Sequence, residues 1–163
     1  MGAHLLVGVE LQKDRIELAR SLGLAHHVIP PGPDALARLK ELTAGRGFER
    51  AVDCSANADG RTLAVRAARQ WGRIALVGEG GTISFNPSPD VIHDQKTIYG
   101  SWVTSIWRME DLVERLVRWG MHPEKLVTHR FPLEKAAEAY SLMASGACGK
   151  VAVAFDEEAK DGR

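Results

Sequence analysis

The sequence lacks the features of several large functional classes. No apolar run approaches the roughly 18 residues that a membrane-spanning helix needs, and the start has no basic region or long apolar core typical of a signal peptide. The 21 basic and 21 acidic residues balance, and no cationic stripe alternates with aromatic residues, which argues against a nucleic-acid partner. We therefore expect no membrane and no nucleic acid among its partners, and a cytoplasmic location.

Cysteine is scarce as well. Cys54 and Cys148 lie far apart and neither belongs to a C-x-x-C pair, so a disulfide framework and a structural zinc site have no support. Both are predicted to be reduced, buried thiols. The six histidines have no partners at the spacing of metal ligands, and the sequence therefore predicts no metal site.

Short apolar runs alternate with amphipathic helical patterns, as is typical of an α/β fold with parallel strands covered by helices. The 163 residues are enough to bury one core. We expect helices at 13–22, after a cap at Asp34, after a cap at Asp59, near 90–94, up to about Gly120, and around 136–143. Strands are predicted at 4–10, 27–29, 50–54, 73–77, 82–85, 97–100, 127–131 and 151–155, and the last eight residues (156–163) are predicted to be a frayed tail.

An acidic residue ends the first apolar strand, in the segment Leu5-Leu6-Val7-Gly8-Val9-Glu10. In a dinucleotide-binding fold such a carboxylate binds the adenosine ribose, about 20 residues after the first glycine of a G-x-G-x-x-G turn. Only nine residues precede Glu10, whereas a parallel crossover alone needs roughly a dozen. The first strand and the phosphate-binding turn are therefore expected to be missing from these residues.

Several further segments follow Glu10 in a recognisable order, and together they resemble the zinc-type medium-chain alcohol dehydrogenases (the medium-chain dehydrogenase/reductase family, which includes alcohol, polyol and threonine dehydrogenases). The match runs from Gly2 to Phe155. The segments that carry it are Gly8-Val9-Glu10, Asp14-Arg15, Leu18-Ala19, Leu22-Gly23, Ala51-Val52-Asp53, Gly72-Arg73, Val77-Gly78, Ile98-Tyr99-Gly100-Ser101, Thr128 to Leu133 and Gly149-Lys150-Val151.

The resemblance implies a truncated Rossmann-type doubly wound parallel sheet that lacks its first strand and its Gly-rich loop. It also implies an NAD-dependent oxidoreductase that passes a hydride between a secondary alcohol or polyol and nicotinamide. The zinc would be held by an N-terminal half that these residues do not include, so no catalytic residue is assigned and this chain alone is expected to be inactive. The alternative is a non-catalytic Rossmann-like nucleotide-binding or assembly module.

The resemblance also implies which residues bind the cofactor, with NAD expected rather than NADP. Glu10 would hold the adenosine ribose, Arg15 would lie at the adenine end, and Lys150 would reach the phosphates. The residues implied at the nicotinamide side all follow strand ends: Cys54, Ser55, Ala56, Val77, Gly78, Glu79, Ser101, Trp102 and Val103.

In terms of domains, the resemblance implies a partial dinucleotide-binding domain at 1–101 and, at 102–155, a segment that packs on the catalytic domain. It further implies a homodimer in which the strand Thr82–Phe85 pairs with its twin.

Simpler interpretations stay open for several of these residues. Glu10 could be a solvated carboxylate, Cys54 a core thiol without a base to activate it, and Lys150 a plain charge before the last strand. The segment 78–81 could be a flexible turn, since it lacks the spacing of a phosphate loop. The four tryptophans are too scattered for a stacking platform, and packing in a core or an interface is expected for each: Trp71, Trp102, Trp107 and Trp119.

Overall fold

The computed structural model describes residues 2–155, so the tail predicted at 156–163 lies outside the described residues. By their contacts the described residues form two compact units, one from Pro31 to Ser105 and one that combines the residues up to Pro30 with those from Ile106 onward. The expected boundary near residue 101, between a dinucleotide-binding domain and the segment after it, is of a different kind from this division by contacts. It stays a prediction.

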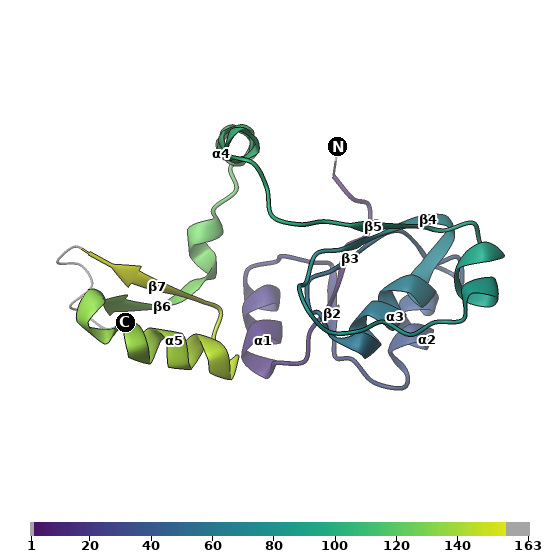
Figure 1. Cartoon of the computed structure of the whole chain (residues 1–163), viewed down its shortest axis with the longest axis horizontal. Coiled ribbons are helices and arrows are strands. Elements are labelled where there is room, and N and C mark those ends of the chain that lie inside the picture. Colours follow the sequence, from purple (N-terminus) through teal and green to yellow (C-terminus); the bar gives the residue numbers. More distant parts are fainter. Residues whose placement is uncertain (1, 156–163) are drawn as a thin grey trace. The chain divides into compact units, whose positions relative to one another are not determined.

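The unit 31–105 is built on a three-stranded parallel sheet in the order β3-β4-β5 (Figure 1). The strands are β3 (Phe48–Asp53), β4 (Ala68–Leu76) and β5 (Thr97–Gly100), and the helices are α2 (Ala35–Glu41) and α3 (Ala58–Ala67), with a short π-helical turn at Ser88–Ile92. Val65 of α3 and Ile74 of β4 are completely buried and form the centre of the core with Ala68.

The other unit contains two pairs of parallel strands. β1 (Val7–Val9) pairs with β2 (His27–Ile29) through the crossover helix α1 (Lys13–Ser21), and β6 (Val127–Pro132) pairs with β7 (Lys150–Ala154) through α5 (Ala136–Ser145). The long helix α4 (Ile106–Trp119) contains no buried residue, and short 3-10 turns lie at Pro123–Leu126 and Leu133–Lys135. All strand pairs of the described residues are parallel, which confirms the predicted α/β class.

Three expectations about local structure are wrong. Residues 82–85 form no strand in the described chain, because a strand needs a hydrogen-bonded neighbour and this segment has none. The side chain that caps α3 is that of Asn57, which accepts from the amides of Asp59 and Gly60, so Asp59 is not the cap. Asp34 does stand at the N-cap of α2, but its side chain makes no capping hydrogen bond.

The burial of β3 also differs from the expectation of a strand covered on both faces. Val52 is 63% exposed, whereas Asp53 is buried. Successive side chains of a strand point to opposite faces, so Cys54, next after Asp53, is exposed. The prediction of a buried thiol is therefore wrong for Cys54, although it is confirmed for Cys148. The four tryptophans are each about 60% exposed or more, so none of them is a core residue of the described chain.

Candidate functional site

The nine residues predicted for the nicotinamide side follow three neighbouring parallel strands. Cys54 to Ala56 come after β3, Val77 to Glu79 after β4, and Ser101 to Val103 after β5. The amides of Val77 and Gly78 donate to the carbonyl of Asp53 (2.8 and 3.1 Å). The amide of Ser101 donates to the carbonyl of Leu76 (3.0 Å). The three segments thus begin at one edge of the sheet, where open α/β sheets bind their ligands.

A buried carboxylate holds the first of these loops. Asp53 is 5% exposed. Its Oδ1 accepts from the amide (3.1 Å) and hydroxyl (2.6 Å) of Ser55, and its Oδ2 accepts from the amide of Ala56 (3.3 Å). Burial acts to raise the pKa of Asp53, but the hydrogen bonds from Ser55, Arg61 and Ala56 outweigh it and hold that pKa below its ordinary value of 3.8. The carboxylate is therefore ionised at neutral pH and fixes the start of the loop.

Arg61 of α3 is the charge partner of Asp53, and our sequence analysis did not identify it. It is 8% exposed, and its Nε donates to Asp53 Oδ2 at 3.2 Å. The sequence did contain a signal for the burial of Arg61. Arg61 precedes Val65 by four residues, which puts it on the buried face of α3, and an arginine is almost never buried unless it is paired.

The loops after β3 and β4 approach each other closely. A Cβ atom added to Gly78 would lie 2.5 Å from the backbone nitrogen of Ala56, and one added to Gly81 would overlap the carbonyl of Ala56. Gly81 also has a φ of +65°, and Ala56 itself lies in the left-handed region at +57°. The segment 78–81 is thus a loop as predicted, and its glycines permit contact that a side chain would block.

The loop side chains themselves are mostly accessible. Cys54, Ser55 and Glu79 are exposed, as are Trp102 (68%) and Val103 (78%). These side chains therefore face solvent, and backbone groups of the three loops line this edge together with them.

The second predicted set lies in the other compact unit, where Glu10 follows β1 and precedes α1. One carboxylate oxygen, Oε1, accepts from the amides of Leu11 (2.7 Å) and Gln12 (2.9 Å). The side chain is partly buried. The carboxylate is held in place at the strand end through one oxygen, and Oε2 makes no hydrogen bond to any of the described residues.

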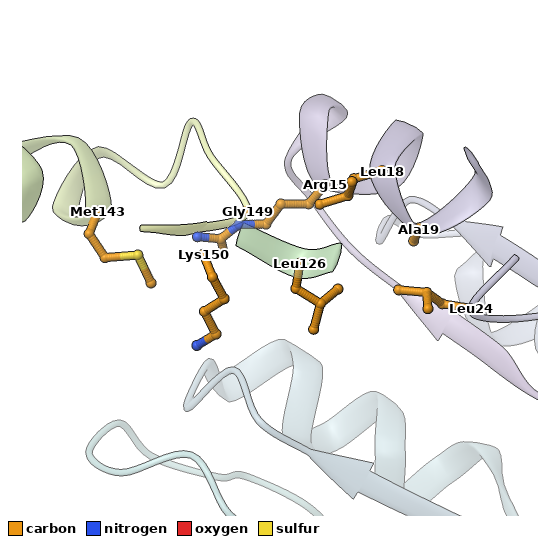
Figure 2. Close-up of a pocket in the computed structure, with 8 residues that line it drawn as sticks. All are labelled: Arg15, Leu18, Ala19, Leu24, Leu126, Met143, Gly149 and Lys150. Atoms are coloured by element: carbon orange, nitrogen blue, oxygen red, sulfur yellow. The ribbon is translucent and has the colours of Figure 1, made fainter. Parts of the chain in front are cut away.

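Arg15, one turn into α1, is also anchored. Its Nε donates to the carbonyl of Cys148 at 2.8 Å, which ties α1 to the turn before β7. Together with Lys150 it lines a pocket of about 260 Å³, and Figure 2 shows its side chain reaching from α1 toward Gly149. The rest of the lining is mostly apolar: Leu18, Ala19, Leu24, Leu126, Met143 and Gly149.

Residues 2–155 bring together no group of three His, Cys, Asp or Glu side chains that could hold a metal ion. Within the same range, no helix is long and apolar enough to cross a membrane.

Comparison with known proteins gives consistent matches. Residues 1–118 match the family described as zinc-binding dehydrogenase. An uncharacterised zinc-type alcohol dehydrogenase-like protein of Escherichia coli is 43% identical over 157 residues, which are 96% of this chain and 44% of that protein. L-threonine 3-dehydrogenase of Symbiobacterium thermophilum is 30% identical over 97% of this chain and 46% of its own length.

Solved structures agree on the fold. Benzyl alcohol dehydrogenase of Acinetobacter calcoaceticus matches 94% of this chain and 44% of its own, with a TM-score of 0.80 and 28% identity. An alcohol dehydrogenase of Thermotoga maritima also reaches a TM-score of 0.80, at 22% identity and over 43% of its own chain. The sequence thus spans less than half of the relatives that it matches.

Proposed function

The chain belongs to the zinc-binding dehydrogenase family, and from that premise we propose that it is the cofactor-binding portion of an oxidoreductase. The proposed reaction passes a hydride between a secondary alcohol or polyol and nicotinamide. Two relatives that it matches are dehydrogenases by name, which supports the reaction class. The substrate would be selected by parts of the longer relatives that have no counterpart in these 163 residues.

The observation that carries the proposal is the carboxylate of Glu10. It stands at the end of a parallel strand, directly before a helix, with one oxygen bound to two backbone amides. The second oxygen can accept hydrogen bonds from the two hydroxyls of an adenosine ribose, which is the role of an acidic residue at this place in a dinucleotide-binding fold. The described residues therefore fit a nicotinamide dinucleotide, whose nicotinamide ring is the hydride acceptor or donor when bound.

The same carboxylate favours NAD over NADP. The 2′-phosphate of NADP would come close to Glu10, and two like charges about 4 Å apart repel by roughly 1 kcal/mol in water and about 4 kcal/mol at an intermediate dielectric. Arg15 works against this preference, because its hydrogen bond to the carbonyl of Cys148 uses only Nε and a guanidinium has further donors for a phosphate.

Two further roles complete the proposal. Lys150, exposed at the start of β7, would offer its ammonium group to the cofactor phosphates. The loops Cys54–Ala56, Val77–Glu79 and Ser101–Val103 would line the nicotinamide side through their backbone groups. The zinc implied by the family does not fit the described residues, which contain no ligand cluster, so no step is assigned to it here.

We also propose that the protein is a homodimer through the segment Thr82–Phe85. Ile83 and Phe85 pack against the core, whereas Thr82 and Ser84 are exposed, the alternation of an edge strand. Arg61 donates to the carbonyl of Thr82 and Thr62 to that of Ser84, which holds the segment extended beside α3. A twin segment across a two-fold axis would supply the strand partner that the single chain lacks.

Cofactor choice is tested in the longest polypeptide that carries this sequence, by kcat/KM for NAD and NADP. We expect kcat/KM to be higher for NAD than for NADP. Glu10→Gln should lower this ratio of NAD to NADP efficiency by tenfold or more. Glu17→Gln, on the exposed side of α1, is the matched control and should leave the ratio unchanged. Equal efficiency of the wild type with both cofactors would contradict the role of Glu10.

The 163 residues alone should bind dinucleotide weakly and catalyse nothing. The Gly-rich turn, which supplies amides and a helix N-terminus to the pyrophosphate in this fold, is not among them. Isothermal titration that gave micromolar NAD binding by residues 1–163 would contradict this. If the chain binds no nucleotide and still assembles with other proteins, the alternative of a non-catalytic assembly module is favoured.

A further inference from the structure

One side chain joins the two loops that follow β3 and β4. The guanidinium of Arg61 donates through Nε to Asp53 (3.2 Å), through Nη2 to the carbonyl of Gly78 (2.6 Å) and through Nη1 to the carbonyl of Thr82 (3.4 Å). Nε thus contacts the end of β3, and the two Nη atoms contact the segment that follows β4. A planar guanidinium presents its donors in a fixed fork, so the three acceptors are held at set positions relative to one another.

The contact continues from Arg61 into the first loop through Asp53. The carboxylate oxygen that does not bind Arg61 accepts two hydrogen bonds from Ser55, while the oxygen that does bind Arg61 also accepts from the amide of Ala56. Both side chains of the ion pair are at most 10% exposed. Neither partner can relax into solvent, since an unpaired buried charge is strongly unfavourable.

The loops also leave no space for a looser arrangement. The backbone of Gly78 lies against that of Ala56, and a Cβ at Gly81 would sit 3.5 Å from Nη1 of Arg61. The position of the guanidinium therefore determines the distance between the two loops.

We propose that Arg61 is a positioning residue for the nicotinamide end of the cofactor. It acts through Asp53 and through the carbonyls of Gly78 and Thr82, and it fixes the loop Cys54–Ala56 against the loop Val77–Thr82. The identity of the ligand rests on the function proposed above, whereas the coupling of the two loops rests on the described contacts alone.

The coupling is tested by amide hydrogen exchange on the full chain. In Arg61→Met the ladder amides of β4 next to Ile74 should accelerate only by the loss of global stability, which urea unfolding measures, whereas the amides of Ser55, Ala56, Val77 and Gly78 should accelerate at least tenfold beyond that loss. Arg61→Lys keeps a cation for Asp53 but cannot reach three acceptors, so Ser55 and Ala56 should be partly restored and Gly78 should not. The lysine variant also keeps the test decisive if the methionine variant fails to fold.

The matched control is Arg66→Met. Arg66 lies on the same helix and also pairs with an aspartate, Asp90, but its side chain is 47% exposed. It should leave the exchange of both loops unchanged. Uniform acceleration of all amides in Arg61→Met would mean that Arg61 only stabilises the fold, and unchanged loop exchange would mean that it does not hold the loops. Either result overturns the proposal.

The cofactor role is tested by saturation-transfer NMR with millimolar NADH. Arg61→Met should reduce transfer to the nicotinamide protons severalfold while transfer to the adenine protons is retained, and Arg66→Met should match the wild type. Equal loss at both ends of NADH, or no loss, would overturn the positioning role. Absence of transfer in the wild type would instead contradict the proposed function, and the exchange experiment would still decide whether Arg61 couples the loops.

Discussion

Residues 31–105 and the remainder of the described chain differ in how they bury their side chains. In the first region Val65 and Ile74 are fully buried, and an ion pair is buried beside them. In the second, α4 exposes seven large apolar side chains by half or more: Ile106, Trp107, Met109, Leu112, Val113, Val117 and Trp119.

The number of strand neighbours explains much of this difference. β4 pairs on both sides, with β3 and with β5, whereas β1, β2, β6 and β7 each have one partner. A sheet or helix forms a core only where another layer covers its apolar face, and two-stranded pairs have little area to cover. The comparison therefore predicts that matched substitutions in the two regions have very different effects.

The largest difference is expected between two ion-paired aspartates. Asp53→Asn leaves Arg61 buried and without its charge partner, which should cost about 3–5 kcal/mol of unfolding free energy. Asp111→Asn breaks the exposed pair with Arg115 on α4, for which about 0.3–0.5 kcal/mol is expected. Urea unfolding followed by circular dichroism measures both. Similar losses in the two variants would show that the Asp53–Arg61 pair is not buried in solution.

The next difference is expected between two apolar truncations. Ile74→Ala, at a fully buried position, should cost about 2–5 kcal/mol through lost contacts and a cavity. Val117→Ala removes methyl groups from a side chain that is 78% exposed, and should change stability by less than about 0.5 kcal/mol. A cost above about 2 kcal/mol for Val117→Ala would mean that another surface covers this face of α4.

Acid should weaken the first region through Asp53. Its pKa is lowered in the folded protein, so the stabilisation is fully present above the ordinary value of 3.8 and is lost as the pH falls through the folded pKa. The pKa of Asp90 is lowered too, chiefly by the hydrogen bond from Arg66, so it contributes in the same direction. In urea titrations Asp53→Asn should lose less unfolding free energy than the wild type as the pH falls below 3.8, and an equal loss in both proteins would contradict this origin.

The smallest effect on stability is expected for polar substitutions on α4. These substitutions should instead reduce the association of the protein with other copies of itself. Val113→Ser with Val117→Ser replaces two exposed apolar side chains one turn apart, and should alter the unfolding free energy by no more than about 1 kcal/mol. Exposed apolar surface promotes association, so light scattering at tens of micromolar should report a lower average mass. Glu114→Ser is the control on the same helix. If the double variant scatters like the wild type, the exposed face of α4 does not drive association.

Local features of the fold were predictable where local rules determine them. The strands at 27–29 and 97–100 have the bounds expected from their apolar runs. Gly146 ends α5 in the left-handed conformation, at φ +75°, because glycine adopts it without strain. Strand β4 was predicted only from Arg73, since its first residues pass through an irregular turn at Trp71, with φ +60°, that apolar periodicity does not reveal.

Some parts of the site were predictable from the sequence and others were not. Resemblance to the family pointed to Glu10, and the strand-end loops follow from the edge rule for parallel sheets. The pairing of Asp53 with Arg61 and the capping by Asn57 were missed, and Cys54 was expected to be buried although it is exposed. The error at Cys54 arose because β3 was expected to be covered on both faces, whereas the face that carries Val52 and Cys54 is exposed. Asn and Asp are both good capping residues, so residue type alone does not choose between Asn57 and Asp59.

The sequence by itself determined the alternation of strands and helices and the position of Glu10 before α1, because these depend on neighbours within a few residues. Only the tertiary structure decided that Arg61 meets Asp53, Gly78 and Thr82, and that Arg15 meets Cys148. Those contacts join residues up to 133 positions apart. Whether such groups meet depends on how strands pair and helices pack, and a buried charge then stabilises the fold only if its partners arrive with it.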